Sequence, residues 1–133
     1  MIGESQLGDG FVPGRHPIEA YGAGGFRFAG MSHRGSILAT PSGIRAFAPA
    51  TLAEIGVSSL APLFAEIAER PRSIEILVIG TGAAFAPPPV ALRDRLKAAG
   101  VRIEAMATGP AARLYNVLLG EDRRAAAILL AAP

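Results

Sequence analysis

Residues 74–82, with the sequence I-E-I-L-V-I-G-T-G, constrain the fold more than any other stretch of the chain. They join a nearly continuous apolar run to an abrupt glycine turn. Large and β-branched side chains in such a run are typical of a strand that is buried on both faces of a parallel sheet. We therefore expect the centre of the fold here. Gly80 and Gly82 would let the backbone turn at the carboxyl end of this strand, where open α/β sheets usually bind ligands.

The segments after this turn predict alternating helices and strands. A helix is expected over 89–99, ended by Gly100, and a strand over 101–105. A strand, a crossover helix and a second strand within about 30 residues form a right-handed unit, so the two strands should be parallel. Thr108 is placed to cap a third helix, and the apolar segment 125–130 predicts a last strand.

The first half of the chain is predicted to be rich in β-structure. Between residues 17 and 47, short extended pieces predict four antiparallel strands at 18–21, 26–29, 36–40 and 44–47. The turns between them are expected at G-A-G-G (22–25), S-H-R-G (32–35) and P-S-G (41–43). A helix at 60–68 should connect them to the second half. Residues 1–14 contain four glycines and a proline without periodicity, and we expect a flexible tail there, followed by a single domain over 15–133. The fold class is therefore α/β, with a β-rich half followed by βαβαβ and a mixed central sheet.

Composition excludes several classes of function. The chain has 133 residues, a net charge of +2 and no cysteine, which excludes disulfides and cysteine nucleophiles. Its arginines are spread along the sequence and are not interleaved with aromatic residues, so nucleic-acid binding is not predicted. No apolar run approaches the roughly 20 residues that span a bilayer, and the start lacks the features of a secretory signal. We expect a cytoplasmic protein that does not insert into membranes, and the sequence does not indicate its oligomeric state.

No catalytic, cofactor or metal site is predicted. The G-T-G turn invites comparison with a dinucleotide-binding fingerprint, but the third glycine is missing and A-F-A-P-P-P separates the turn from the next helix. His16 and His33 lack a carboxylate at metal-ligand spacing. The aspartates are scattered, so no pair of carboxylates can be assigned to hydrolysis.

One binding cleft can nevertheless be predicted from the strand order. If the strands are parallel, Gly80, Thr81 and Gly82 should lie beside Thr108, where the amino end of the third helix would favour small anions or a carboxylate of a partner. Arg113 would add charge to this cleft. Further along the same helix are Tyr115 and Asn116, which we include as binding residues at its exposed side. An Asn in the middle of a helix is unfavourable unless its side chain is hydrogen-bonded.

Several motifs in one order resemble a known family. They are A-Y-G-x-G-G-F-R-F at 20–28, G-S-I-L-A-T-P-S-G at 35–43, I-L-V-I-G-T-G at 76–82, L-K-A-A-G-V at 96–101, E-A-M-x-T at 104–108, A-R-x-Y-N-V-L at 112–118 and R-R-A-A-A-I-L-L at 123–130. Together they are similar to the Mth-type domain of unknown function, over about residues 17–130. This family includes the mitochondrial assembly factor 3 of respiratory complex I.

The resemblance implies a three-layer fold and a non-enzymatic binding protein, with another protein as partner in the assembly of a membrane or respiratory complex. The bacterial relatives imply a bacterial setting. The alternative is a small-molecule or anion-binding protein, or an enzyme, that uses the loops at the carboxyl ends of the parallel strands. The chain departs from the family at Phe47, Ala112 and Leu114, where Trp, Cys and Thr are frequent.

Overall fold

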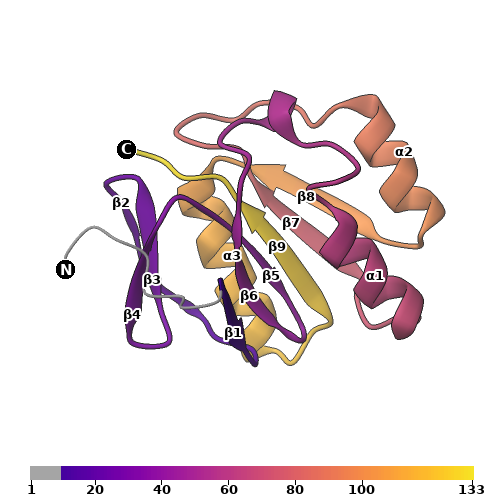
Figure 1. The fold of residues 1–133 in the computed structure, drawn as a ribbon, viewed down its shortest axis with the longest axis horizontal. Coiled ribbons are helices and arrows are strands. Elements are labelled where there is room, and N and C mark those ends of the chain that lie inside the picture. The colour runs from indigo at the N-terminus through magenta and orange to yellow at the C-terminus, as the bar shows by residue number, and fades with distance from the viewer. Residues whose placement is uncertain (1–9) are drawn as a thin grey trace.

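The apolar run predicted at the centre of the fold forms the buried parallel strand β7, Ile76–Gly80. In the computed structural model, which describes residues 10–133, β7 lies between β8, Arg102–Met106, and β9, Ala125–Leu129, and is parallel to both (Figure 1). All five residues of β7 are buried, as expected for a strand covered on both faces. The prediction of a parallel unit at the centre of the sheet is confirmed.

The large sheet continues from β9 with antiparallel strands. Its order is β1-β6-β5-β9-β7-β8, where β5 is Ser36–Thr40 and β6 is Gly43–Phe47. β5 pairs antiparallel with both β6 and β9, so the sheet is mixed. The predicted turn at 41–43 joins β5 to β6 as a tight hairpin. The mixed sheet expected from the sequence is therefore present.

The first strand, β1, corrects the boundary of the predicted tail. Residues 1–9 of that tail lie outside the described residues, but β1, Phe11–Pro13, pairs antiparallel with Gly43–Arg45 at the edge of the large sheet. The Arg45 guanidinium lies 4.6 Å from the centre of the Phe11 ring, which adds a cation–π contact. Three residues between glycines are too few to show an alternating pattern, which is why sequence reasoning missed this strand.

The other strands form a separate antiparallel sheet of three strands. They are β2, Ile18–Gly22, β3, Gly25–Phe28, and β4, Met31–Arg34. The first two strands were predicted, but S-H-R-G at 32–35 was expected to be a turn, whereas Ser32–Arg34 are in β4. The turn in fact precedes β4.

Two-residue turns explain this error. Ala23 and Gly24 have φ of 53° and 80°, and Ala29 and Gly30 have φ of 52° and 73°. Positive φ at both central residues is the signature of the type I′ hairpin turn, which Asn-Gly usually indicates in a sequence. With alanine at the first position the sequence does not predict this turn, because alanine rarely adopts a positive φ.

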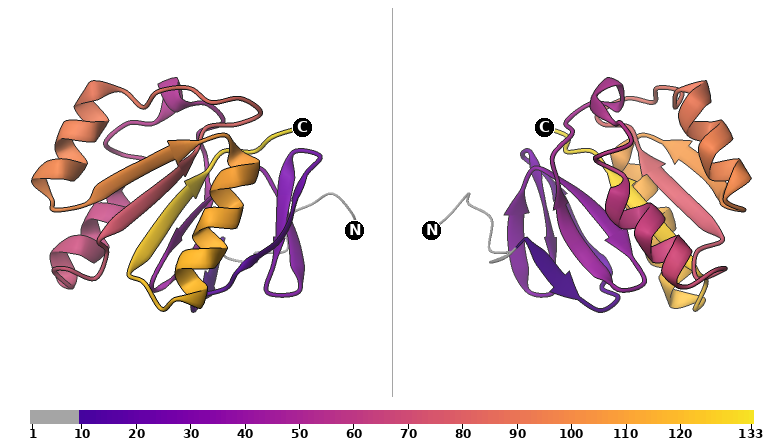
Figure 2. Two further views of the ribbon diagram at one scale, coloured as in Figure 1. Left: turned by 180° about the vertical axis from the view of Figure 1, so that it is seen from behind. Right: turned by 45° about the vertical axis from the view of Figure 1, so that its right-hand side comes forward.

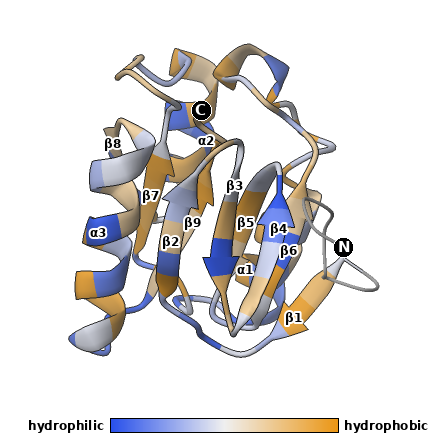
Figure 3. Cartoon of the chain, turned by 90° about the vertical axis from the view of Figure 1, so that its left-hand side faces the viewer, coloured by the Kyte–Doolittle hydropathy of each residue, from blue (hydrophilic) through white to orange (hydrophobic). Residues whose placement is uncertain are grey.

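The large sheet separates two hydrophobic cores. One face is covered by α1, Ala61–Glu69, and α2, Val90–Ala98, and the other by α3, Thr108–Gly120, together with the small sheet (Figure 2). A short 3₁₀ helix, Leu52–Glu54, precedes α1. Coloured by hydropathy, the central strands β5 and β7 are mainly apolar, as their double coverage requires (Figure 3). The predicted three-layer α/β fold is confirmed by this arrangement.

Leu96 tests the assignment of the inward face of α2. Its side chain is fully buried in the core under α1 and α2. We expect Leu96→Ala to lower the free energy of unfolding by about 2 to 5 kcal/mol, since it removes buried methyl groups and leaves a cavity. Chemical denaturation measures the loss. Val90→Ala on the same helix, at an exposed position, should change it by less than about 0.5 kcal/mol. Equal losses in the two variants would contradict the assignment.

Candidate functional site

The structure brings together four residues predicted for the cleft at the carboxyl edge of the sheet: Gly80, Thr81, Gly82 and Thr108. The Thr108 N–H donates to the Gly82 carbonyl at 2.9 Å, and the Gly82 N–H donates to the Thr108 hydroxyl at 2.9 Å. Thr81 follows the strand directly, and its N–H donates to the Met106 carbonyl at 2.8 Å. The juxtaposition follows from the parallel strands β7 and β8.

The Thr108 hydroxyl joins the start of α3 to the end of the central strands. It donates to the Leu130 carbonyl at 2.7 Å while accepting the bond from Gly82, and the residue is completely buried. Thr108 was predicted to cap the helix. The helix instead begins at Thr108, with Ala107 as the N-cap residue and no side-chain cap bond. The donors and acceptors expected to face a ligand are thus bonded to one another.

Gly80 is required for close packing rather than for the turn. A Cβ atom at this position would lie 3.0 Å from Thr108 Cα, from Thr108 Oγ1 and from Leu129 Cδ2. Any larger residue would push α3 away from the sheet. The turn itself lies at Gly82, where φ is 106°. The sequence therefore predicted a glycine turn in the right place but assigned to both glycines the role that only Gly82 has.

The amino end of α3 is covered by a tyrosine from the small sheet. The Tyr21 hydroxyl lies so close to Gly109 that a Cβ atom there would clash with it. The same hydroxyl accepts a hydrogen bond from Arg113 Nη1 at 3.3 Å. Arg113 is therefore engaged with Tyr21, on the side of α3 that faces the small sheet, and it is not aimed at the G-T-G turn.

Asn116 fastens the small sheet to α3. Its Oδ1 accepts a hydrogen bond from the Ile18 N–H at 2.7 Å, and its Nδ2 donates to the Ile18 carbonyl at 2.8 Å. The side chain thus pairs with the backbone of β2 as a neighbouring strand would. This pairing supplies the partner that a mid-helix Asn requires.

Tyr115 is a core residue and not part of an exposed surface. Its ring is fully buried among the apolar residues between α3 and the small sheet. Its hydroxyl has no hydrogen-bond partner within residues 10–133. Burial raises the pKa of Tyr115 to about 12, because the phenolate would lose its hydration. Tyr115 therefore cannot take part in the exposed binding surface expected around it, whereas Asn116 is only partly buried.

The loop after β7 has an ordered shape that Thr81 imposes. Its hydroxyl donates to the Ala84 carbonyl at 2.7 Å and accepts a hydrogen bond from the Ala86 N–H at 3.1 Å. Pro88 is buried, so the loop is fixed at both ends. Between these ends Phe85 projects with 61% of its surface exposed. Sequence reasoning missed Phe85, although a single large aromatic in a loop of alanines and prolines was the available signal.

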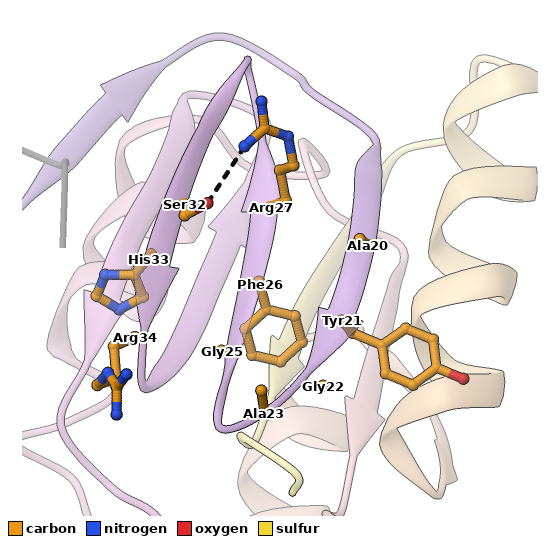
Figure 4. Close-up of a pocket in the computed structure, with 10 residues that line it drawn as sticks. All are labelled: Ala20, Tyr21, Gly22, Ala23, Gly25, Phe26, Arg27, Ser32, His33 and Arg34. Carbon is orange, nitrogen blue, oxygen red and sulfur yellow. Dashed lines mark hydrogen bonds between the residues drawn. The ribbon is translucent and has the colours of Figure 1, made fainter. Parts of the chain in front are cut away.

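A shallow hollow of about 510 Å³ lies on the small sheet (Figure 4). Arg27 Nη1 donates to Ser32 Oγ across it at 3.3 Å, and Arg27 also pairs with Glu19 at 3.4 Å. The neighbouring His33 is buried, and this burial lowers its pKa. The hollow is lined by Ala20, Tyr21, Gly22, Ala23, Gly25, Phe26, Arg27, Ser32, His33 and Arg34. It is open to solvent and was not predicted.

Within residues 10–133, no group of three or more His, Cys, Asp or Glu side chains is placed to hold a metal ion. None of the described helices is both long enough and apolar enough to cross a bilayer.

The Thr108 hydroxyl provides a direct test of this junction. Thr108→Val keeps the shape of the side chain but leaves the Gly82 N–H and the Leu130 carbonyl without a partner. We expect a loss of about 2 to 4 kcal/mol in the free energy of unfolding. Thr108→Ser retains the hydroxyl and should lose roughly half as much or less. If chemical denaturation gives the same loss for both variants, the hydrogen bonds do not stabilise the junction.

Comparison with solved structures shows which folds the chain shares. A crystal structure described as an outer membrane protein from Bartonella henselae has 44% sequence identity and a TM-score of 0.81, covering 91% of this chain and 98% of that one. A solution structure of a Mth938-like domain from Bordetella pertussis has 30% identity and a TM-score of 0.73, covering 86% of this chain and 85% of that one. The three-layer arrangement is common to both.

Sequence relatives point to the same group of proteins. An uncharacterized protein of Rhodobacter capsulatus is 42% identical over 120 residues, which cover 90% of this chain and 88% of that protein. The NADH dehydrogenase [ubiquinone] 1 alpha subcomplex assembly factor 3 of Danio rerio is 32% identical over 116 residues, covering 87% of this chain and 64% of the relative. The profile described as protein of unknown function (DUF498/DUF598) matches residues 18–130, and the chain therefore belongs to this family.

Proposed function

We propose that this chain is a binding protein that recognises another protein through the loop after β7, with Phe85 as the anchor. The observation that carries the proposal is the exposure of Phe85 on a loop that Thr81 holds in one conformation. Exposed aromatic side chains on ordered supports are the usual anchors of protein interfaces. Because the loop is already ordered, it would lose little conformational entropy when a partner binds.

The surroundings of Phe85 support a protein ligand rather than a small molecule. Val90, at the start of α2, is exposed over 70% of its surface, so a second apolar side chain follows shortly after the loop. Placing an exposed Phe in an interface contributes about 1.5 to 3 kcal/mol of burial. The polar groups of Gly82 and Thr108 beside the loop are hydrogen-bonded within the chain, so they offer no free donors to a small polar ligand.

The biological role that fits such a binding protein is assistance in the assembly of a protein complex. The relative from Danio rerio is named as an assembly factor of NADH dehydrogenase. We extend that role to this chain as a non-enzymatic, assembly-factor-like protein that acts in the cytoplasm. Its support is the likeness of the two sequences together with the exposed loop.

Phe85→Ser tests the proposal. The free energy of unfolding of the variant should stay within about 0.5 kcal/mol of the wild type, because the side chain is exposed. The amount of partner recovered in affinity purification should fall at least about tenfold. Quantitative mass spectrometry of purifications from the source organism measures that recovery. Val117→Ser is the matched control, since Val117 is exposed over 54% of its surface on α3, away from the loop.

Two results would contradict the proposal. The first is equal recovery of every partner by the Phe85 and Val117 variants. The second is a small molecule that copurifies with the wild-type chain and is lost from the Phe85 variant while all protein partners are retained. The second result would favour the alternative of a small-molecule site at this edge of the sheet.

A further inference from the structure

The outer edge of β8 is the feature of the molecule that the proposed function leaves unexplained. β8 is the last strand of the large sheet, and within residues 10–133 no strand pairs with its outer side. Seen from behind, β8 runs along the border of the sheet with α2 beside it (Figure 2). An unpaired edge strand is a template for the addition of another strand, and proteins usually protect such edges.

The pairing of β8 with β7 shows which of its backbone groups point outward. The Arg102 N–H donates to the Glu75 carbonyl at 2.9 Å, and the Met106 carbonyl accepts from the Thr81 N–H at 2.8 Å. In a strand, alternate residues direct their N–H and C=O groups to the same side. Ile103 and Ala105 therefore direct theirs away from the sheet, towards the place of an additional strand.

Space for an additional strand exists beside this edge. An open hollow of about 420 Å³ lies between α2 and the first half of β8. Three of its six lining residues are basic, and none is acidic; the lining consists of Arg93, Lys97, Gly100, Val101, Arg102 and Ile103. Gly100 has no side chain, and no heavy atom of the described residues beyond its chain neighbours lies within 4 Å of the place its Cβ would take, so a backbone can approach at this point.

The positive charge of this hollow is only weakly compensated. Arg102 forms an ion pair with Glu104 at 3.9 Å, and both side chains are largely exposed. Neither the Arg93 nor the Lys97 side chain makes an ion pair with any residue from 10 to 133. A ligand with carboxylates would meet two unpaired cations on the α2 side of the edge.

We propose that β8 accepts an extended acidic segment of a partner protein by β-strand addition. Backbone hydrogen bonds to Ile103 and Ala105 would hold the segment, and its carboxylates would lie on Arg93, Lys97 and Arg102. Main-chain pairing gives affinity in this mode, while charge selects the sequence. This surface is separate from the Phe85 loop, so the inference goes beyond the proposed function and does not depend on it.

A second copy of the chain fits the same edge less well. Antiparallel self-pairing centred on Ile103 would place Arg102 opposite Glu104 of the other copy, which is favourable. The same two-fold axis would also bring Arg93 and Lys97 of both copies together, because all of them line the hollow near Ile103. Four uncompensated cations around one axis would repel each other, whereas an acidic segment neutralises them.

The experiment uses the full chain and a defined probe, the blocked peptide Glu-Val-Glu-Val-Glu-Val-Glu. Amide chemical shifts and hydrogen exchange are followed during its titration. We expect the largest shifts and about tenfold slower exchange at the outward amides of Ile103 and Ala105. Two control peptides separate the contributions: one has Lys in place of every Glu, and the other carries N-methyl groups on its three central amides. Neither should bind.

Variants of the chain complete the test. Lys97→Glu should weaken binding of the acidic peptide by at least about threefold. The control Arg70→Glu makes the same charge change at the carboxyl end of α1 and should change the affinity for the peptide by less than about twofold. Ala105→Pro removes one outward N–H without breaking a bond to β7 and should abolish binding while the fold is retained. The Phe85→Ser variant should bind the peptide as the wild type does, so failure here and failure of the Phe85 loop are distinguishable.

Three outcomes would overturn the inference. Equal binding of the Lys peptide would show that charge does not select the ligand. Binding of the N-methylated peptide would show that backbone pairing does not hold it. Protection of Ile103 and Ala105 without any peptide, with a mass in light scattering of twice the 13.7 kDa of one chain, would show that a second copy occupies the edge.

Discussion

The Thr108 hydroxyl is the group on which the arrangement of the layers most depends. It lies where the loop after β7, the end of β9 and the start of α3 meet, and it bonds to the first two while belonging to the third. Gly80 allows this contact because any side chain there would meet Thr108. The position of α3 on the sheet is therefore fixed by one buried hydroxyl and one missing side chain. Since α3 carries Asn116, which pairs with Ile18, the small sheet is positioned through the same helix.

The internal hydrogen bonds of Gly82, Thr108 and Leu130 limit where a ligand can bind. Backbone groups at the carboxyl ends of parallel strands commonly receive ligands in α/β proteins. Here the Gly82 N–H, the Gly82 carbonyl and the Leu130 carbonyl are hydrogen-bonded to Thr108 instead. Tyr21 covers the first turn of α3. The surfaces that are left for a partner are of another kind. One is the apolar loop that carries Phe85, and the other is the basic edge of β8. We propose both as surfaces for protein partners rather than for small anions.

The sequence predicted the parts of the fold in which local pattern and burial agree. β7, α2 and α3 have long periodic or continuous apolar patterns, and the structure has them where expected. The small sheet was only partly predicted, because the turn before β4 has Ala29 at a position where Asn is the usual sequence signal. For the site, parallel strands brought Thr108 to the G-T-G turn, but the sequence contains no information on which donors bond to each other. The need of Asn116 for a partner was predictable, whereas its partner Ile18, 98 residues away, was not.

We propose that the polar groups at the carboxyl edge of β7 serve the structure and not a ligand. The test is a phosphate titration followed by amide chemical shifts, with sodium chloride at matched ionic strength as the reference. We expect the amide chemical shifts of Gly82 and Thr108 to stay unchanged, because each N–H donates a buried or partly buried internal hydrogen bond. Saturable shifts clustered at residues 80–84 and 108–113 would contradict it and would establish an anion-binding cleft at the start of α3.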